Sequence, residues 1–356
     1  MPEANPLYEW LNRTIESTGP VPIAAFMAQA NAHYYATRDP LGVAKEGEAG
    51  GDFVTAPEVS QMFGEMIGLW CADLAMRAEA GKDFAYVELG PGRGTLAADA
   101  LRSMARFGLA PRVHLVETSP VLKRAQAARV PDARFHETIE TLPDDRPLVV
   151  IANEFFDALP IEQYISTTAG WRERVVGRHK GRLIAMPGNA PADDAVPEDL
   201  RRQPPGMIVE QCPHAAAIAD DLAARIAVQG GALLVIDYGY LGPKVGDTLQ
   251  SVRRHRIADP FDDPGEQDLT AHVDFAALAK PVRERGLRVD GPIEQGKFLH
   301  TLGLGHRAEA LRCQNPARDT EIITQYHRLT DPYEMGSLFK AMAMTAPGWP
   351  DPEGFA

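Results

Sequence analysis

Hydrophobic residues recur at helical spacing in two stretches near the start of the chain, residues 7–35 and 57–80. Such spacing gathers the apolar side chains on one face of a helix, which can then pack against a core. Prolines punctuate the first stretch, and the glycine-rich segment 47–51 separates the two. We therefore expect an N-terminal helical cap region over residues 1–80.

From Phe84 onward, the pattern changes to short apolar runs that alternate with amphipathic stretches. This alternation is typical of a parallel sheet flanked by helices. The pattern therefore predicts a doubly wound α/β core formed by residues 81–160 and 210–302. The expected strands are Phe84–Leu89, Arg112–Glu117, Arg134–His136, Leu148–Ala152 and Ala232–Asp237, and the expected helices are Leu96–Phe107 and Ala276–Glu284.

Residues 161–209 interrupt this alternation between the fourth and fifth expected strands. Three runs in this segment have the composition of antiparallel strands joined at glycines, namely Ile161–Ile165, Trp171–His179 and Arg182–Met186. The tail, Pro187–Pro205, is rich in Pro, Ala and Asp and predicts an exposed loop. We expect an inserted β-meander over residues 161–209.

The end of the chain predicts two further features. The runs Leu287–Ile293 and Gly296–Thr301 flank Glu294-Gln295 and suggest a hairpin that closes the sheet. Residues 303–356 have a helical pattern and end in a Pro- and Gly-rich tail.

Charge limits the classes of partner. The chain of 356 residues has a formal net charge of -13, whereas a nucleic-acid footprint needs clustered Lys and Arg to displace counterions from phosphate. We therefore expect no nucleic-acid partner. An acidic protein suits cationic ligands or basic protein segments, although the same charge could equally serve only solubility. No apolar run approaches membrane-spanning length, so we expect no membrane insertion.

The cysteines and the first residues suggest a cellular setting. Cys71, Cys212 and Cys313 are far apart and show neither the spacing of a zinc site nor the density of a disulfide scaffold. Residues 1–10 contain two acids and no Lys or Arg, so they lack the pattern of a signal or transit peptide. We expect a reducing, cytoplasmic protein without a metal site.

A glycine-rich turn follows the first expected strand, in the segment VELGPGRGT of residues 87–95. Glycine permits positive φ and lets a ligand approach the backbone closely. A turn that joins a strand to a helix in an α/β unit is a ligand loop candidate. Taken alone it is weak, because such turns can also serve only to reverse the chain.

Spacing and charge at this turn decide between two cofactors. A dinucleotide fingerprint, G-x-G-x-x-G/A, would need Gly or Ala at position 95, where this chain has Thr95. A dinucleotide also carries a pyrophosphate, which Glu88 would repel, whereas S-adenosylmethionine carries an ammonium and a sulfonium, which a carboxylate attracts. These features favour S-adenosylmethionine.

The second expected strand ends in Glu117. At this place in the unit a carboxylate can accept hydrogen bonds from both ribose hydroxyls of a cofactor. The alternative is a helix cap, although Thr118-Ser119-Pro120 already supplies a helix start. We favour the cofactor role.

Polar residues follow the fourth expected strand, in the segment IANEFFDALP of residues 151–160. Doubly wound folds bind ligands at this carboxyl edge of the sheet. Glu154 and Asp157 lie three residues apart, so on a turn or helix start they could converge on one cationic group. Phe155 and Phe156 are more typical of core residues.

Two further segments carry candidate chemistry. In DLTAHVDF, residues 268–275, His272 is the side chain whose charge can change near neutral pH, although a loop histidine is more often structural. In residues 51–58, Thr55 could be a helix N-cap and Glu58 its third helical residue. The cap does not exclude cofactor contact.

Five motifs together make the chain resemble one family. It is similar to the MidA family of class I methyltransferases, which includes a mitochondrial protein-arginine methyltransferase that assists assembly of respiratory complex I. Two positions depart from the family pattern: Ala56 stands where serine is usual, and His33 precedes the tyrosine pair where glycine is expected. The resemblance spans roughly residues 7–345 and is carried by GDFVTAPEVSQMFGE, VELGPGRGTL, NEFFDALP, IDYG and DLTAHVDF, in this order.

The resemblance implies a Rossmann-like, seven-stranded methyltransferase sheet that binds S-adenosyl-L-methionine. It implies that Glu154, Asp157 and His272 face the methyl acceptor, with Glu154 the first candidate for a guanidinium. A protein substrate, first of all a respiratory complex I subunit, is the implied partner. The candidate cofactor-binding residues are Asp52, Thr55, Glu58, Glu88, Gly90, Pro91, Gly92, Gly94, Thr95, Glu117, Thr118 and Asn153.

Three alternative functions stay open on sequence alone. The fold says little about the acceptor, so a methyltransferase for a small molecule is one. An assembly or chaperone-like protein that holds the cofactor without transferring a methyl group is another, because the additions to the core could form a docking surface. A nicotinamide oxidoreductase is disfavoured by Thr95 and Glu88.

Overall fold

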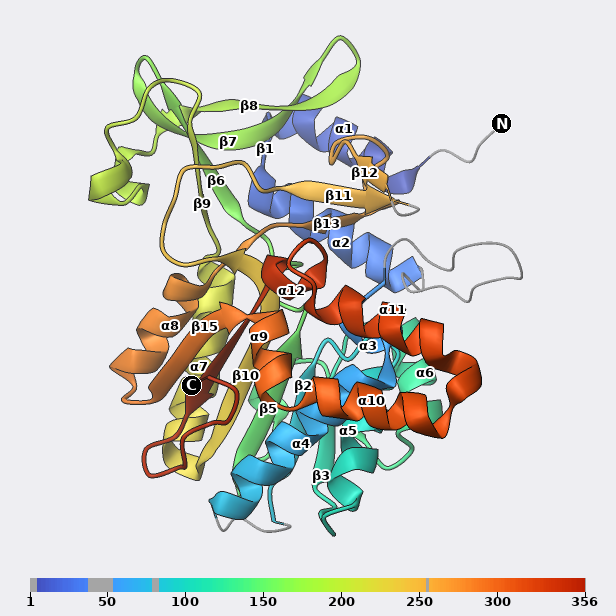
Figure 1. Cartoon of the computed structure of the whole chain (residues 1–356). Helices are drawn as coiled ribbons and strands as arrows, with labels where there is room; N and C mark the ends of the chain where they lie inside the picture. Colours follow the sequence, from blue (N-terminus) through green and yellow to red (C-terminus); the bar gives the residue numbers. More distant parts are fainter. Residues whose placement is uncertain (1–4, 38–53, 79–82, 254–255, 356) are drawn as a thin grey trace. The chain divides into compact units, whose positions relative to one another are not determined.

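The computed structural model describes residues 5–37, 54–78, 83–253 and 256–355, and the chain divides into two units (Figure 1). The first unit consists of Met1–Phe53, Asp157–Ala217 and Tyr240–Ala277, and the second of Val54–Phe156, Ile218–Gly239 and Leu278–Ala356. These boundaries divide the predicted cap region between the two units, because its first part belongs to the first unit and its last part to the second.

The second unit is built on a sheet of mostly parallel strands. Strand β16 runs antiparallel to both of its neighbours, β15 and β10, whereas β10, β5, β2, β3 and β4 are parallel to one another. In sheet order the strands are β15 (Arg288–Glu294), β16 (Phe339–Thr345), β10 (Gly231–Tyr240), β5 (Leu148–Asn153), β2 (Ala85–Leu89), β3 (Arg112–Val116) and β4 (Arg134–His136).

The apolar runs of the sequence become the central strands because helices cover both faces of this sheet. Every residue of β2 and β5 is buried. The five strands predicted for the core are confirmed, with ends shifted slightly. They are parallel in the structure, so their carboxyl ends meet at one edge and bring together the turns that follow them.

The helices of the second unit include the predicted helix after the glycine turn, α5. Its neighbour α4 packs closely against it: a β-carbon on Gly68 would lie 2.4 Å from the carbonyl oxygen of Ala100. Helices α7 (Pro213–Gln229) and α8 (Phe275–Glu284) run from the first unit into the second. The remaining helices are α3 (Ala56–Val59), α4 (Gln61–Arg77), α5 (Thr95–Ala105), α6 (Pro120–Arg129), α9 (Gln295–Thr301), α10 (Leu304–Gln314), α11 (Asp319–Thr330) and α12 (Met335–Leu338), with short 3-10 turns at Ile139–Thr141 and Pro316–Arg318.

The start of β10 allows a sharp test of packing. Gly231 has φ of +119°, and a β-carbon there would lie 1.9 Å from the backbone oxygen of Leu148. Gly231→Ala should therefore destabilise the protein by about 3 kcal/mol, because backbone must move. Gly108→Ala is the control: φ is +72° but nothing lies within 4 Å, so strain alone should cost about 1 kcal/mol. Denaturant unfolding of both variants measures the difference, and equal losses would contradict the packing explanation.

The first unit contains the predicted insert and two N-terminal helices. Its larger sheet has the order β1-β7-β6-β9 with β8 paired to β7, and a second sheet has the order β12-β11-β13. Its core includes Leu11, Phe26, Met27 and Val176. The elements are α1 (Pro6–Thr18), β1 (Val21–Pro22), α2 (Ile23–Thr37), β6 (Glu162–Thr167), β7 (Gly170–His179), β8 (Arg182–Pro191), β9 (Ile208–Gln211), β11 (Gln250–Arg253), β12 (Arg256–Ala258), β13 (Asp268–Thr270) and β14 (Val273–Asp274), with 3-10 turns at Asp193–Ala195 and Glu198–Leu200.

The predicted closing hairpin is half wrong. Residues 288–294 do form β15, but residues 295–301 form helix α9, and the antiparallel partner of β15 is β16. Strand β16 lies in the last fifty residues, for which the sequence predicted helix. Its sequence, FKAMAMT, is rich in the helix formers Ala and Met, and insertion between β10 and β15 overrides that preference.

No helix in the described parts of the chain has the length and apolar character that crossing a membrane requires.

Candidate active site

The glycine turn joins β2 to α5 in the second unit. Gly90, Gly92 and Gly94 have φ of +59°, +52° and +77°, in the left-handed region that side chains disfavour. A β-carbon on Gly90 would also lie 3.0 Å from the ring of Phe155. Inside the turn, the Gly94 amide donates to the Pro91 carbonyl at 2.7 Å. The turn thus presents bare backbone at the carboxyl end of β2.

Glu117 follows β3 and is held in place on both oxygens. Its Oε1 accepts from the Ser119 amide at 2.7 Å, and its Oε2 accepts from the Gln126 side chain at 3.1 Å. Burial is the main reason that the pKa of this carboxyl is raised. Thr118 beside it is exposed. The carboxylate is therefore fixed in orientation at the same sheet edge as the glycine turn.

Gln126 is a residue that sequence reasoning missed. It is fully buried in α6, and its amide nitrogen donates both to Glu117 and, at 2.6 Å, to the carbonyl of Gly92. One side chain thus ties the acid to the glycine turn. A glutamine within an amphipathic helix normally faces solvent, so no signal for this role is visible in the sequence. Its Oε1 is buried without a hydrogen-bond partner in the described part of the chain.

Glu88 is more deeply buried than a charged side chain normally is. Only 3% of it is exposed, its Oε2 accepts from the Tyr86 hydroxyl at 2.8 Å, and burial raises its pKa from 4.5 to about 8. At neutral pH without ligand, this carboxyl is therefore mainly protonated. A fixed negative charge was predicted at Glu88, and the structure instead places there a carboxyl that can ionise when a cation approaches.

This raised pKa predicts a pH dependence of stability. Glu88 binds a proton in the folded state up to about pH 8 but loses it near pH 4.5 in the unfolded chain. Its favourable contribution is thus complete below pH 4.5 and is lost as the pH rises towards 8, by up to about 1.4 kcal/mol per pH unit. Glu88→Gln should remove this slope. Denaturant unfolding of both proteins between pH 5 and 9 measures it, and parallel curves would contradict the assignment.

Residues 54–58 also belong to the candidate active site. Thr55 is the N-cap of α3, as predicted, but its side chain makes no capping hydrogen bond. Glu58 does not close a capping box either, since its Oε1 accepts from the Thr95 hydroxyl at 2.5 Å. Glu58 therefore joins α3 to the first residue of α5. Asp52 lies outside the described residues.

The turn after β5 carries the candidate acid. Glu154 has φ of +50°, which is rare for a residue with a side chain and costs on the order of 1–3 kcal/mol. Its Oε1 accepts from the Ala56 amide and from the Asn153 side chain, each at 3.1 Å. Asn153 Oδ1 is buried and has no partner among the residues described. Backbone strain and buried oxygens without partners recur at ligand sites, so this turn is a candidate for one.

Asp237 is a further residue for which no role was predicted from the sequence. It is fully buried near the end of β10, and its Oδ2 accepts from the Phe156 amide at 3.1 Å. The Asp237 carboxylate therefore fixes the backbone just after Glu154. The IDYG motif contains this residue, but the motif alone does not reveal its partner.

Asp157 and His272 belong to the first unit, where hydrogen bonds join their segments. The Ala271 amide donates to the Asp157 carbonyl at 2.9 Å. Asn31 of α2, which is buried, donates to the carbonyls of Ala158 at 2.9 Å and Leu269 at 2.8 Å. The structure therefore brings these two segments together. Asn31 was not singled out from the sequence, because its partners are distant along the chain.

His272 is half-buried, and its backbone amide donates to the Thr248 hydroxyl at 2.9 Å. Burial, and next the positive charge of Lys244, lower the pKa of its imidazole. The imidazole is therefore neutral at physiological pH and suited to accept a proton. Glu154 belongs to the second unit, so convergence of Glu154, Asp157 and His272 on one acceptor stays a prediction.

Three comparisons show which known proteins this chain is similar to. A family described as "Putative S-adenosyl-L-methionine-dependent methyltransferase" matches residues 66–293. The human "Protein arginine methyltransferase NDUFAF7, mitochondrial" is 34% identical over 379 residues, which cover 95% of this chain and 83% of the relative. The Drosophila melanogaster homolog is 35% identical over 381 residues, which cover 95% of this chain and 84% of the relative.

A solved structure of a "likely methyl transferase" has a similar fold. A COG1565 superfamily member from Burkholderia thailandensis, bound to S-adenosyl-homocysteine, is similar over 99% of this chain and 96% of that chain, with a TM-score of 0.84 and 26% identity. A TM-score this high over nearly the whole chain confirms an α/β methyltransferase fold with a large central sheet and helices.

The predicted cytoplasmic setting is wrong, because the curated relatives are mitochondrial proteins. The prediction rested on cysteines without disulfide or zinc spacing, and that criterion does not separate one reducing compartment from another.

The resemblance and the cofactor predicted from the sequence are confirmed. The match to the family description covers more than half of the chain, and the relatives match nearly all of it. This chain therefore belongs to that family of S-adenosyl-L-methionine-dependent methyltransferases.

Proposed function

We propose that the chain methylates arginine side chains of a protein substrate. The relatives that match nearly the whole chain are protein arginine methyltransferases by name. The observation that carries the proposal is the Glu154 carboxylate, held in a strained turn whose next residue, Phe155, contacts the glycine turn. A carboxylate at this edge can offset the repulsion between a guanidinium and a cationic methyl donor.

The residues of the second unit fit the cofactor. S-adenosylmethionine supplies a methyl group on a sulfonium. Glu117 would accept hydrogen bonds from the ribose hydroxyls, and the bare backbone of the glycine turn would lie against the cofactor. The unpaired oxygens of Gln126 and Asn153 offer acceptors for its donor groups. Thr55, Glu58, Thr95 and Thr118 complete this proposed site.

In this proposal, three residues bind the arginine that accepts the methyl group. Glu154 binds the planar guanidinium through two hydrogen bonds and orients one nitrogen, which is a positional contribution to catalysis. Asp157 supports it with a second negative charge. His272, neutral at physiological pH, accepts the proton that the guanidinium releases.

The proposal extends to the architecture. The strands from β15 to β4 would be the seven-stranded sheet of a class I methyltransferase, and the N-terminal helices would cap the cofactor site.

The test is methyl transfer from labelled S-adenosylmethionine to the respiratory complex I subunits of the source organism. We expect label in one subunit, and mass spectrometry should locate it on arginine. Label that enters only small metabolites would favour a small-molecule methyltransferase. Absence of transfer, with cofactor binding intact, would favour a binding protein that assists assembly.

A further inference from the structure

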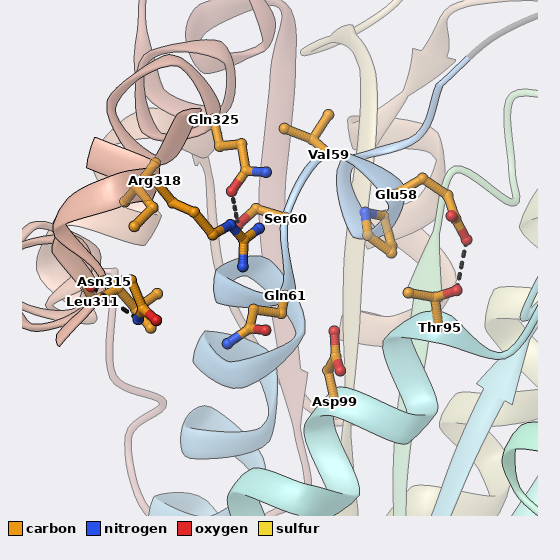
Figure 2. Close-up of a pocket in the computed structure, with 12 residues that line it drawn as sticks. Glu58, Val59, Ser60, Gln61, Thr95, Asp99, Leu311, Asn315, Arg318 and Gln325 are labelled. Carbon is orange, nitrogen blue, oxygen red and sulfur yellow. Dashed lines mark hydrogen bonds between the residues drawn. The ribbon is translucent and has the colours of Figure 1, made fainter. Parts of the chain in front are cut away.

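An open pocket of about 460 Å³ lies in the second unit, between the α3–α4 junction, α5 and the α10–α11 pair. Figure 2 shows Asp99 of α5 pointing into the space between Gln61 of α4 and the Glu58–Thr95 pair. Two predicted cofactor residues, Glu58 and Thr95, therefore also line this pocket. Most of the other lining groups play no part in the methyl transfer described above.

Most hydrogen-bond donors in the pocket wall are already engaged. The Arg318 guanidinium forms two hydrogen bonds with Glu321, at 2.9 and 2.7 Å. The Gln325 amide nitrogen also donates to Glu321, at 3.1 Å, and the Ser60 hydroxyl donates to Gln325 at 3.0 Å (Figure 2). On α11, Nε and Nη2 of Arg318 and the Gln325 amide nitrogen thus all donate to Glu321.

Several hydrogen-bond acceptors in the pocket lining, by contrast, have no partner among the described residues. Asp99 is only 8% exposed and pairs with Arg102 through Oδ1, and Glu58 bonds Thr95 through Oε1. Within the described residues, the second oxygen of each carboxylate has no partner. The same holds for the side-chain oxygens of Gln61 and Asn315. The pocket lining therefore has a surplus of acceptors, and its two carboxylates, Glu58 and Asp99, stand against one cation, Arg318, whose charge Glu321 offsets.

This surplus identifies the class of ligand. A guanidinium carries five donors and no acceptor, and its planar fork suits carboxylate and amide oxygens. Leu311, Ile322 and Val59 in the wall offer apolar contact for the methylene stem of an arginine. The carboxyl of Asp99, whose pKa is raised by burial first and by Glu65 and Glu58 among lesser causes, would gain from a neighbouring cation.

We propose that this pocket binds an arginine side chain of the protein substrate, separate from the arginine that is methylated. The inference rests on the proposed function and adds a second anchor for the same substrate. Thr95 starts α5 directly after Gly94, so an arginine held here anchors the peptide beside the cofactor turn. The net charge of -13 favours a basic segment as the partner.

The test is binding of a synthetic peptide of repeating Arg-Gly-Gly, followed by fluorescence anisotropy with S-adenosyl-homocysteine present. Gln61 is exposed at the start of α4, so a charge can be added there without disturbing the core. Gln61→Lys should weaken binding about tenfold because it adds a positive charge to the pocket, and Gln61→Glu should strengthen it several-fold because it adds a negative one. Asp99→Asn should weaken binding as well.

The control is Asn189→Lys, which adds the same charge on an exposed residue of β8 in the first unit. It should leave peptide affinity unchanged. The inference is overturned if the wild-type protein does not bind the peptide, if citrulline in place of arginine binds equally well, or if Gln61→Lys and Asn189→Lys have equal effects. The readout is binding without methyl transfer, so failure of the arginine methyltransferase proposal would appear separately, in the labelling experiment.

Discussion

Replacing Glu117 with alanine is expected to weaken the binding of S-adenosyl-homocysteine by at least about a hundredfold. The Glu117 carboxylate is oriented by Ser119 and Gln126, so it would meet two ribose hydroxyls without rearranging. Two hydrogen bonds to a charged group contribute about 3 kcal/mol together, which corresponds to this loss of affinity. Isothermal titration calorimetry measures the dissociation constant.

A second acid at the same sheet edge supplies the control for this experiment. Glu137 follows β4, its side chain is 78% exposed, and it pairs with Lys123 at the surface. Glu137→Ala should therefore leave the affinity for S-adenosyl-homocysteine unchanged. If Glu117→Ala keeps wild-type affinity while remaining folded, Glu117 is a structural anchor for Gln126 and not a cofactor residue.

Replacing Glu154 with glutamine is expected to lower kcat for methyl transfer by about a hundredfold, with little change in cofactor affinity. Glutamine keeps the side-chain oxygen that accepts from the Ala56 amide, so the turn after β5 should persist. It loses the negative charge that the proposal needs to hold a guanidinium beside a sulfonium. Steady-state kinetics with the labelled protein substrate separates kcat from the cofactor affinity.

Glu198→Gln makes the same chemical change at an exposed position of a 3-10 turn in the first unit. Its kinetics should match the wild type. A Glu154→Gln protein with unchanged turnover would remove Glu154 from the mechanism. A protein with lost turnover and also lost cofactor affinity would mean that the turn itself had changed.

Much of the core could be predicted because its strands are continuous apolar runs bounded by turn residues. Burial on both faces dictates such runs, as in β2 and β5, where every residue is buried. The order in which the strands lie could not be predicted in the same way. Strand β16 lies between β10 and β15, and its Ala- and Met-rich sequence gave the opposite, helical prediction.

The candidate site also contains residues that could be predicted from the sequence and residues that could not. The glycine turn and Glu117 were found because local geometry and position after a strand leave marks in the sequence. Gln126 and Asn31 were missed, although each is buried and makes several hydrogen bonds across distant segments. Neither residue type nor spacing reveals a partner that only folding brings near.

By itself, the sequence determined that this chain would place a glycine-rich turn and acids at the ends of buried strands, because local spacing controls both. The tertiary structure decided that Glu88 is buried and mostly protonated, that Gln126 ties Glu117 to the turn, and that the acceptors around Asp99 face one pocket. Desolvation and long-range hydrogen bonds set these properties, and both depend on neighbours that only the folded chain supplies.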